Sequence, residues 1–313
     1  MRPDQQDHLS LVPPAPEPTR PPLRAVRESG IPPRPHQAAG LRVVRKPEES
    51  PVLRFRRRDL QLGCVSFAIT SGKGGVGKTQ LSANLGVCFA QRGLRVLMLD
   101  ADVGLASLDL ALGIKPHDDL RAVIRGEAKV QDVLCEGPAG VHIVPACPGR
   151  YDMANMSTEE RGRLQSAVQD LARGYDVLLV DTGAGIGSNA VAFAGGADEA
   201  VLVVTPDPTS LRDAYAMAKV LHRRSGIDQI RVVANQVHSD AEGADIFDRL
   251  NEIVQRFMTL QLVFLGSIAM HAAVRSAVVD GTPYVLAQPE SLPARAVQAI
   301  ARRLLPPMPK QVS

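Results

Sequence analysis

Residues 72–79 bring together glycines, a lysine and a hydroxyl at a spacing that can bind phosphate. The segment reads G-K-G-G-V-G-K-T and satisfies the pattern G-x-x-x-x-G-K-[ST]. Glycines let backbone N–H groups close around phosphate oxygens, Lys78 can reach the terminal phosphates, and Thr79 can ligate Mg²⁺. A second lysine, Lys73, stands five positions before the one that the pattern requires. The loop residues expected to contact a nucleotide are Gly72, Lys73, Gly74, Gly75, Val76, Gly77, Lys78, Thr79 and Gln80.

Three carboxylates stand at the ends of later apolar runs. Asp100 and Asp102 follow one run, and Asp181 ends another. An acid at a strand end can hold the water shell of Mg²⁺, and one a step further on can orient or deprotonate an attacking water. We therefore expect Asp100 and Asp181 near the metal and Asp102 at the water. The glycines after Asp181, including Gly185, allow a backbone amide to approach a γ-phosphate and to move when it is lost.

These residues need a frame that brings strand ends together. Short apolar runs rich in β-branched residues are typical of buried parallel strands, and segments with helical spacing separate them. The pattern predicts a doubly wound α/β fold with a mostly parallel sheet of about seven strands flanked by helices. The expected strands are residues 64–70, 95–100, 141–146, 176–181, 200–205, 230–235 and 262–268, and the expected helices include 78–91, 157–173, 209–224 and 244–257.

The beginning of the chain has a different composition. Eleven of the 24 prolines fall within residues 1–50, and residues 1–62 carry a net charge of +5 against −2 for the rest. We expect a disordered, basic arm over residues 1–61, a folded domain over 62–305 and a tail over 306–313. A nearly neutral domain with 4% aromatic residues argues against a DNA binder without excluding one. With no apolar run of about 18 residues and no secretory signal, we expect a cytoplasmic protein.

Four segments together resemble the MinD/ParA family of deviant Walker A ATPases, which are P-loop NTPases of the SIMIBI class. They are K-G-G-V-G-K-T, the D-x-D-x-G-x-x-x-L-D segment from Asp100, D-T-G-A-G-I from Asp181, and PDPTSLRDAYAMAK from Pro206. The resemblance covers about residues 62–305, and within the family it is strongest to the FlhG branch, also called FleN or YlxH. It implies a slow ATPase that uses ATP and Mg²⁺ and acts as a dimerisation switch controlling flagellar number or placement.

The resemblance also assigns roles to single residues. Lys73 matches the family's signature lysine, which reaches the nucleotide of the other subunit and so implies an ATP-dependent homodimer. Asp102 matches the family's hydrolysis-critical aspartate, Asp100 and Asp181 match metal-associated positions, and Asn235 matches the residue that hydrogen-bonds adenine. The expected catalytic residues are Lys73, Lys78 and Asp102. The positions implied for the switch and dimer face are Asp102, Asp181, Gly185 and Asp213.

Two segments outside this core suggest partners. Residues 36–42, HQAAGLR, resemble the element by which FlhG proteins stimulate the GTPase FlhF, and residues 4–10 are a second, poorer match. The residues carrying the first match are Gln37, Leu41 and Arg42. Residues 292–305 form an amphipathic helix that either docks on its own domain or makes a peripheral membrane contact.

Other classes of the same superfamily remain open. A ParA-type partition ATPase would bind DNA without sequence preference, and a MinD analogue would select a division site. A metabolic enzyme or iron–sulfur carrier would need a small acceptor molecule or cysteines paired across a dimer, for which Cys135 and Cys147 are the candidates. The four cysteines lack C-x-x-C spacing, which favours small core residues instead.

Overall fold

The computed structural model describes residues 63–102, 107–116, 120–146 and 157–305. These residues form one sheet with the strand order β3-β4-β2-β5-β1-β6-β7-β8. Neighbouring strands run parallel except β3 and β4, which are antiparallel. The strands are β1 (Val65–Ser71), β2 (Val96–Ala101), β3 (Cys135–Glu136), β4 (His142–Val144), β5 (Val177–Ala184), β6 (Glu199–Val204), β7 (Gln229–Val237) and β8 (Gln261–Ala269).

All seven predicted strands are present, and the predicted α/β class is confirmed. The eighth strand, β3, was not predicted because two residues are too few to show an apolar alternation. Residues 1–62, with the arm motif at 36–42, and residues 306–313 lie outside the described residues, as does Cys147.

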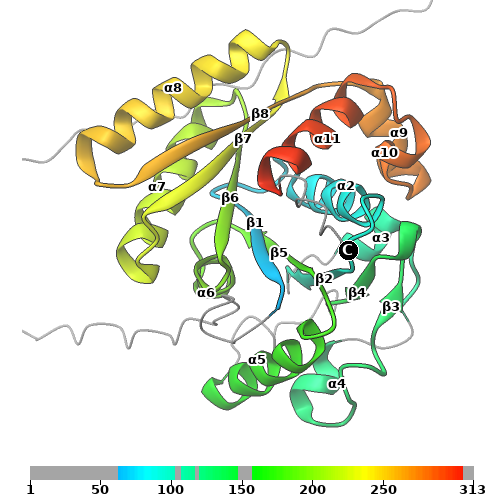
Figure 1. Cartoon of the computed structure of the whole chain (residues 1–313). Coiled ribbons are helices and arrows are strands. Elements are labelled where there is room, and N and C mark those ends of the chain that lie inside the picture. The colour runs from blue at the N-terminus through cyan, green and yellow to red at the C-terminus, as the bar shows by residue number, and fades with distance from the viewer. Residues whose placement is uncertain (1–62, 103–106, 117–119, 147–156, 306–313) are drawn as a thin grey trace, which may run out of the picture. The chain divides into compact units, whose positions relative to one another are not determined.

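Helices cover both faces of the sheet (Figure 1). Successive residues of a strand point to opposite faces, so that Phe67 and Ile69 of β1 join one buried cluster and Ala68 joins the other. The first cluster holds side chains from α2, α3, α9, α10 and α11, and the second from α4 to α8. The helices are α2 (Lys78–Ala90), α3 (Leu108–Leu112), α4 (Leu120–Arg125), α5 (Thr158–Ala172), α6 (Ser188–Gly196), α7 (Pro208–Ser225), α8 (Asp240–Phe257), α9 (Ala272–Asp280), α10 (Tyr284–Ala287) and α11 (Leu292–Leu304).

Helix α8 begins four residues before the predicted start at Ala244. The Ser239 hydroxyl accepts a hydrogen bond from the Glu242 N–H and caps the helix at Asp240. Gly243 therefore lies inside the helix, where a Cβ would come within 2.0 Å of Ser267 Oγ on β8. A glycine usually marks a helix end, but here close packing on the sheet requires it.

Helix α11 packs against its own domain. Of the predicted apolar stripe, Val297, Ile300, Ala301 and Leu304 are buried against β8 and α2, while Leu292 is 56% exposed. Arg92 holds the end of the helix by donating to the carbonyls of Ala301 and Leu305. Most of the stripe is therefore engaged in the core. Within the described residues, no helix is long and apolar enough to span a bilayer.

The strand order places a crevice at the centre of the sheet. Strand β1 lies between β5 and β6. Strands β2 to β5 lie on one side of it and β6 to β8 lie on the other, so the strand order reverses direction at β1. In doubly wound sheets, ligands bind beyond the carboxyl ends of the strands at such a switch point. The predicted phosphate loop follows β1 directly. Asp100 and Asp181 pair side by side on the neighbouring β2 and β5, one residue before the end of β2 and three before the end of β5.

Candidate functional site

The loop over residues 72–79 has the backbone of an anion cradle. Gly75 and Gly77 have φ values of 76° and 91°, and Gly77 is also the N-cap of α2. L side chains rarely adopt this left-handed conformation, which turns successive N–H groups toward one point. Gly72 is required for a different reason, because a Cβ there would lie 2.0 Å from the Asp213 carbonyl oxygen on α7. The loop is therefore fitted closely to α7 at one end and opens onto α2 at the other.

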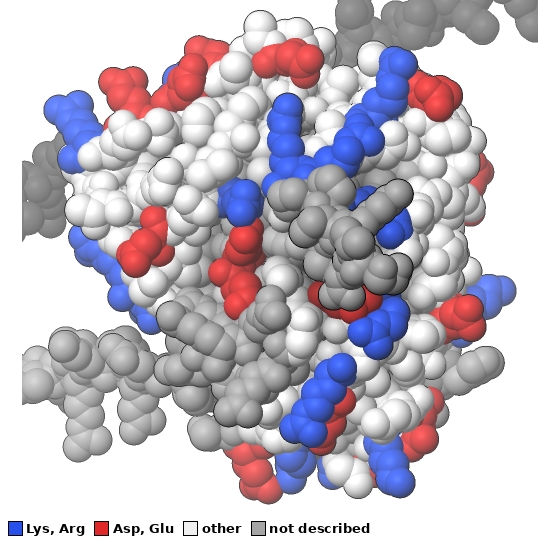
Figure 2. Space-filling view, viewed as in Figure 1, with Lys and Arg blue, Asp and Glu red and all other residues white. Residues whose placement is uncertain are grey.

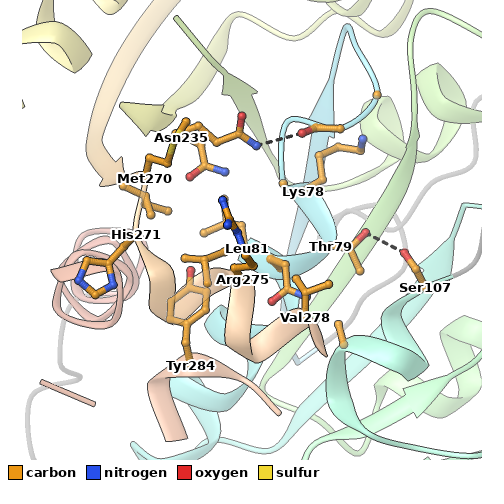
Figure 3. Close-up of a pocket in the computed structure, with 18 of the residues that line it drawn as sticks. Lys78, Thr79, Leu81, Ser107, Asn235, Met270, His271, Arg275, Val278 and Tyr284 are labelled. Atoms are coloured by element: carbon orange, nitrogen blue, oxygen red, sulfur yellow. Dashed lines mark hydrogen bonds between the residues drawn. The ribbon is translucent and has the colours of Figure 1, made fainter. Parts of the chain in front are cut away.

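A cavity of ≈ 790 Å³ lies beside this loop. In Figure 3, Lys78 and Thr79 border it on one side, with Met270, His271 and Tyr284 across from them. The loop side is polar, whereas α9, α10 and the end of β8 supply a largely apolar wall suited to a flat base, with His271 and Arg275 as its polar members. Besides these five, the lining residues are Gly74, Gly75, Gly77, Gln80, Leu81, Asp102, Ser107, Leu110, Ala111, Ala184, Asn235, Gln236, Ile268, Ala269, Val274, Arg275 and Val278.

Lys78 is a buried cation at the floor of this cavity. Its side chain is only 7% exposed, and burial lowers the pKa of its ammonium group, which the charges of Asp181 and Asp102 partly oppose. A buried ammonium is costly unless it meets an anion. A bound phosphate would supply that anion, so the cradle and the lysine fit a nucleoside triphosphate.

Asp100 and Asp181 are buried next to each other. Burial, together with their mutual repulsion, raises the pKa of Asp100, and burial raises the pKa of Asp181. The Asp181 carboxylate accepts hydrogen bonds from Thr79 and, at 2.9 Å, from Ser82 Oγ. Asp100 accepts from the backbone N–H groups of Asp102, Ser107 and Leu108. Asp100 therefore also holds the chain that leaves β2.

Hard oxygen donors of this kind suit Mg²⁺. No group of three or more His, Cys, Asp or Glu side chains among the described residues could hold a metal by itself. Mg²⁺ usually takes one or two protein oxygens and completes its shell with phosphates and waters. Thr79, with Asp181 behind it, fits that arrangement, and a cation there would relieve the repulsion between the two carboxyls.

Asp102 and Gly185 lie on two loops beside the cavity. Asp102 lines it, and its Oδ1 would lie 3.4 Å from a Cβ placed on Gly183, which shows that the chain after β2 meets the last residues of β5 here. The Gly185 N–H donates to the Ser71 carbonyl at 3.0 Å, with Gly185 at φ 80°. The loop after β5 is thereby tied to the start of the phosphate loop.

Lys73 is held away from the cavity within its own subunit. Its Nζ donates to Asp207 Oδ2 and, at 2.8 Å, to Thr209 Oγ1 at the start of α7. Asp207 is the N-cap of that helix and also accepts from the Thr209 N–H at 2.7 Å. These donors hold the pKa of the Asp207 carboxyl well below its usual range. In this conformation Lys73 contacts α7 rather than a nucleotide.

The other predicted residues take ordinary positions around the loop. Asn235, at the end of β7, lines the cavity and donates from Nδ2 to the Val76 carbonyl at 2.7 Å. Gln80 lines the cavity on α2. Asp213 pairs through its carboxylate with Arg212 at 3.1 Å on the outer side of α7. The structure thus gathers the loop, Asp102 and Asn235 at one cavity and leaves the Asp213 carboxylate outside it.

Several residues of the site were not predicted. Ser82 donates to Asp181, and Asp207 and Thr209 hold Lys73. Asn84 and Gln236 were also missed. Each of these residues makes at least one hydrogen bond to a residue distant in sequence, which no local spacing reveals.

Comparison with known proteins identifies a nucleotide-binding domain in this chain. Residues 67–284 match the family model described as the CobQ/CobB/MinD/ParA nucleotide binding domain. The chain is 43% identical over 238 residues to the antiactivator FleN of Pseudomonas aeruginosa, covering 76% of this chain and 85% of FleN. It is 34% identical over 240 residues to the flagellum site-determining protein YlxH of Helicobacter pylori, covering 76% and 81%.

A solved structure shares the fold. The septum site-determining protein MinD of Pyrococcus horikoshii, complexed with Mg-ADP, has 25% sequence identity and a TM-score of 0.63, with 78% of this chain and 96% of that chain covered. The chain therefore belongs to the MinD/ParA family of P-loop ATPases, whose ligands are ATP and Mg²⁺, and within it is similar to the flagellar proteins FleN and YlxH.

Proposed function

We propose that this ATPase is an ATP-dependent dimerisation switch that controls the number or placement of flagella. The observation that carries the proposal is the 43% identity to FleN over most of the folded domain, together with Lys73 at the edge of a complete phosphate loop. The 34% identity to YlxH supports the same biological role. A ParA-type partition role and a MinD-type division role are the alternatives that the tests below separate.

At the site, we assign the phosphates to the loop and to Lys78, and Mg²⁺ to Thr79 with Asp100 and Asp181 behind it. Asp102 orients the water that attacks the γ-phosphate in line. Asn235 holds the adenine through its free amide hydrogen and oxygen. The supporting observations are the glycine conformations, the buried Lys78 and the shared cavity.

Dimerisation follows from the position of Lys73. If Lys73 leaves Asp207, it can pair with the more highly charged γ-phosphate bound to a second subunit. That pairing exists only while ATP is bound and the two subunits are in contact. Hydrolysis removes that anion and returns Lys73 to its own subunit. This exchange couples association to the nucleotide state.

Two further partners belong to the proposal, and DNA is a third candidate that the surface does not favour. Residues 36–42 of the arm would contact an FlhF-like GTPase. A peripheral membrane contact would use the exposed arginines of α11, since its apolar stripe is buried; Figure 2 shows basic side chains over the part of this face where α11 lies. On the same face acidic and basic side chains are interspersed, which does not favour a DNA-binding surface.

The test of the role is complementation of a Pseudomonas aeruginosa strain that lacks FleN, scored by counting flagella per cell. Wild-type protein should restore the count, and Lys73→Ala and Asp102→Ala should not. A stable, ATP-hydrolysing protein that leaves the count unchanged would contradict the flagellar role. Binding to non-specific DNA that falls steeply between about 50 and 200 mM salt would favour the partition role. ATP-dependent recruitment to anionic vesicles with no effect on flagella would favour the division role.

A further inference from the structure

Two side-chain amides donate hydrogen bonds to backbone carbonyls of the phosphate loop. The Gln236 Nε2 donates to the Gly75 carbonyl at 3.0 Å, and Asn235 Nδ2 donates to the neighbouring Val76 carbonyl at 2.7 Å. Both residues stand at the carboxyl end of β7, about 160 positions away along the chain. Consecutive amides thus meet consecutive carbonyls.

These hydrogen bonds fix the direction of the loop carbonyls, which affects how the loop binds anions. A loop whose N–H groups converge on a phosphate turns its carbonyls the other way, and a carbonyl that rotated inward would oppose the phosphate charge. The Gln236 and Asn235 amides, which donate to these carbonyls, hold them turned away from the phosphate. The Gly75 and Val76 carbonyls belong to the segment from Gly75 to Gly77, whose first and last residues are glycines in the left-handed conformation.

The backbone at Gln236 is strained in a way that serves this contact. Among the described residues only Ala139 and Gln236 are non-glycine positions with positive φ, and Gln236 has φ 59°. The pairing of β7 with β8 shifts register between Asn235 and Val237, so Gln236 is the extra residue. Such a bulge re-aims a side chain, and here the Gln236 amide reaches the loop while Val237 returns to the core. Strain of this kind persists where the surrounding structure enforces it.

We propose that Gln236 is a positioning residue for the phosphate loop, which it holds in its anion-binding form by fixing the Gly75 carbonyl outward. The inference rests on the proposed role of that loop in binding the phosphates of ATP. Asn235 shares the task but also faces the base, and it packs so tightly that a Cβ on Gly77 would lie 2.3 Å from its Nδ2. Gln236 lines the same cavity, so comparing ATP with a ligand that has no base separates an effect on phosphate from an effect on the base.

The experiment measures displacement of a fluorescent ATP analogue by Mg²⁺-ATP and by Mg²⁺-tripolyphosphate, which has no base. The variants are Gln236→Ala, which removes the amide, and Gln236→Gly, which removes both the amide and the strain. The matched control is Gln229→Ala on the same strand, where the amide instead donates to Gln261 at 2.9 Å. Thermal unfolding of each variant reports on folding separately.

Both Gln236 variants should bind ATP and tripolyphosphate more weakly by the same factor, about 2- to 12-fold for one lost hydrogen bond. Gln229→Ala should match the wild type. An unchanged tripolyphosphate affinity in Gln236→Gly, or a loss seen with ATP alone, would overturn the positioning role. If tripolyphosphate fails to displace the analogue from wild-type protein, the assignment of the loop to phosphate is itself wrong.

Discussion

Lys73 and Asp207 form an ion pair within one subunit, although they are 134 positions apart in sequence. The pair joins the phosphate loop to the first turn of α7, and its side chains are 37% and 43% exposed. Since the proposed dimer needs the same lysine at a second nucleotide, this pair competes with dimerisation. In the proposed dimer Lys73 would leave Asp207, which stabilises the position that the lysine holds in the single chain.

Replacing Asp207 with asparagine should favour the dimer. Asn is as good an N-cap as Asp, so α7 keeps its cap, while the charge that holds Lys73 is lost. Because exposed ion pairs are weak, we expect half-maximal dimerisation at roughly two- to fivefold lower protein concentration in ATP. Light scattering in ATP and in ADP measures this. Asp228→Asn, at an exposed site beyond the end of α7, is the control, and an unchanged midpoint in Asp207→Asn would show that the pair does not restrain Lys73.

The stability of the ligand-free protein should fall as pH rises above the ordinary carboxyl pKa of about 4. Asp100 and Asp181 have raised pKa values in the folded protein, so it binds more protons than the unfolded chain and loses that advantage once they ionise. Mg²⁺-ATP brings a cation to the pair, and its stabilising effect should grow over the same range.

Thermal unfolding midpoints measured at several pH values, with and without Mg²⁺-ATP, test this dependence. Asp100→Asn removes one of the two repelling charges and should flatten the curve for ligand-free protein. A curve for Asp100→Asn that runs parallel to the wild-type curve would mean that other groups set the pH dependence.

Asn84 should be critical for the cavity wall. This fully buried side chain donates to the Gln80 carbonyl at 2.7 Å and accepts from the Val285 N–H at 3.0 Å, which joins α2 to α10. Asn84→Ala leaves that N–H buried without a partner, which costs about 1–3 kcal/mol in the free energy of unfolding. Urea denaturation measures the loss. Asn251→Ala on α8 is the control, because Asn251 Oδ1 is buried with no hydrogen-bond partner within the described structure; equal losses would contradict the role of Asn84.

Helix α11 offers a test of whether its apolar stripe serves the core. Ile300 is 1% exposed and Leu292 is 56% exposed on the same helix. Ile300→Ala should lower the free energy of unfolding by about 2–5 kcal/mol, and Leu292→Ala should change it by less than about 0.5 kcal/mol. Chemical denaturation of both variants decides this. A small effect of Ile300→Ala would mean that the helix detaches readily and that its stripe is available to a membrane.

Much of the fold could be predicted because its signals are local. The parallel strands are continuous apolar runs, and the loop over residues 72–79 has a spacing that only a phosphate cradle needs. Asp100 and Asp181 could be placed at neighbouring strand ends, since parallel strands end at one edge of the sheet. The two-residue β3 and the start of α8 were missed because one is too short to show a pattern and the other contains a glycine selected by packing.

The α/β class, the loop over residues 72–79 and the carboxylates near the strand ends can be read from the chain alone, because each depends on neighbouring residues and on periodicity. Three contacts appear only in the folded molecule: Lys73 with Asp207, Gln236 with the phosphate loop, and the stripe of α11 with β8 and α2. Those contacts join residues far apart in the chain. Which of the many polar side chains meet depends on how the helices pack on the sheet, and no spacing within one segment contains that information.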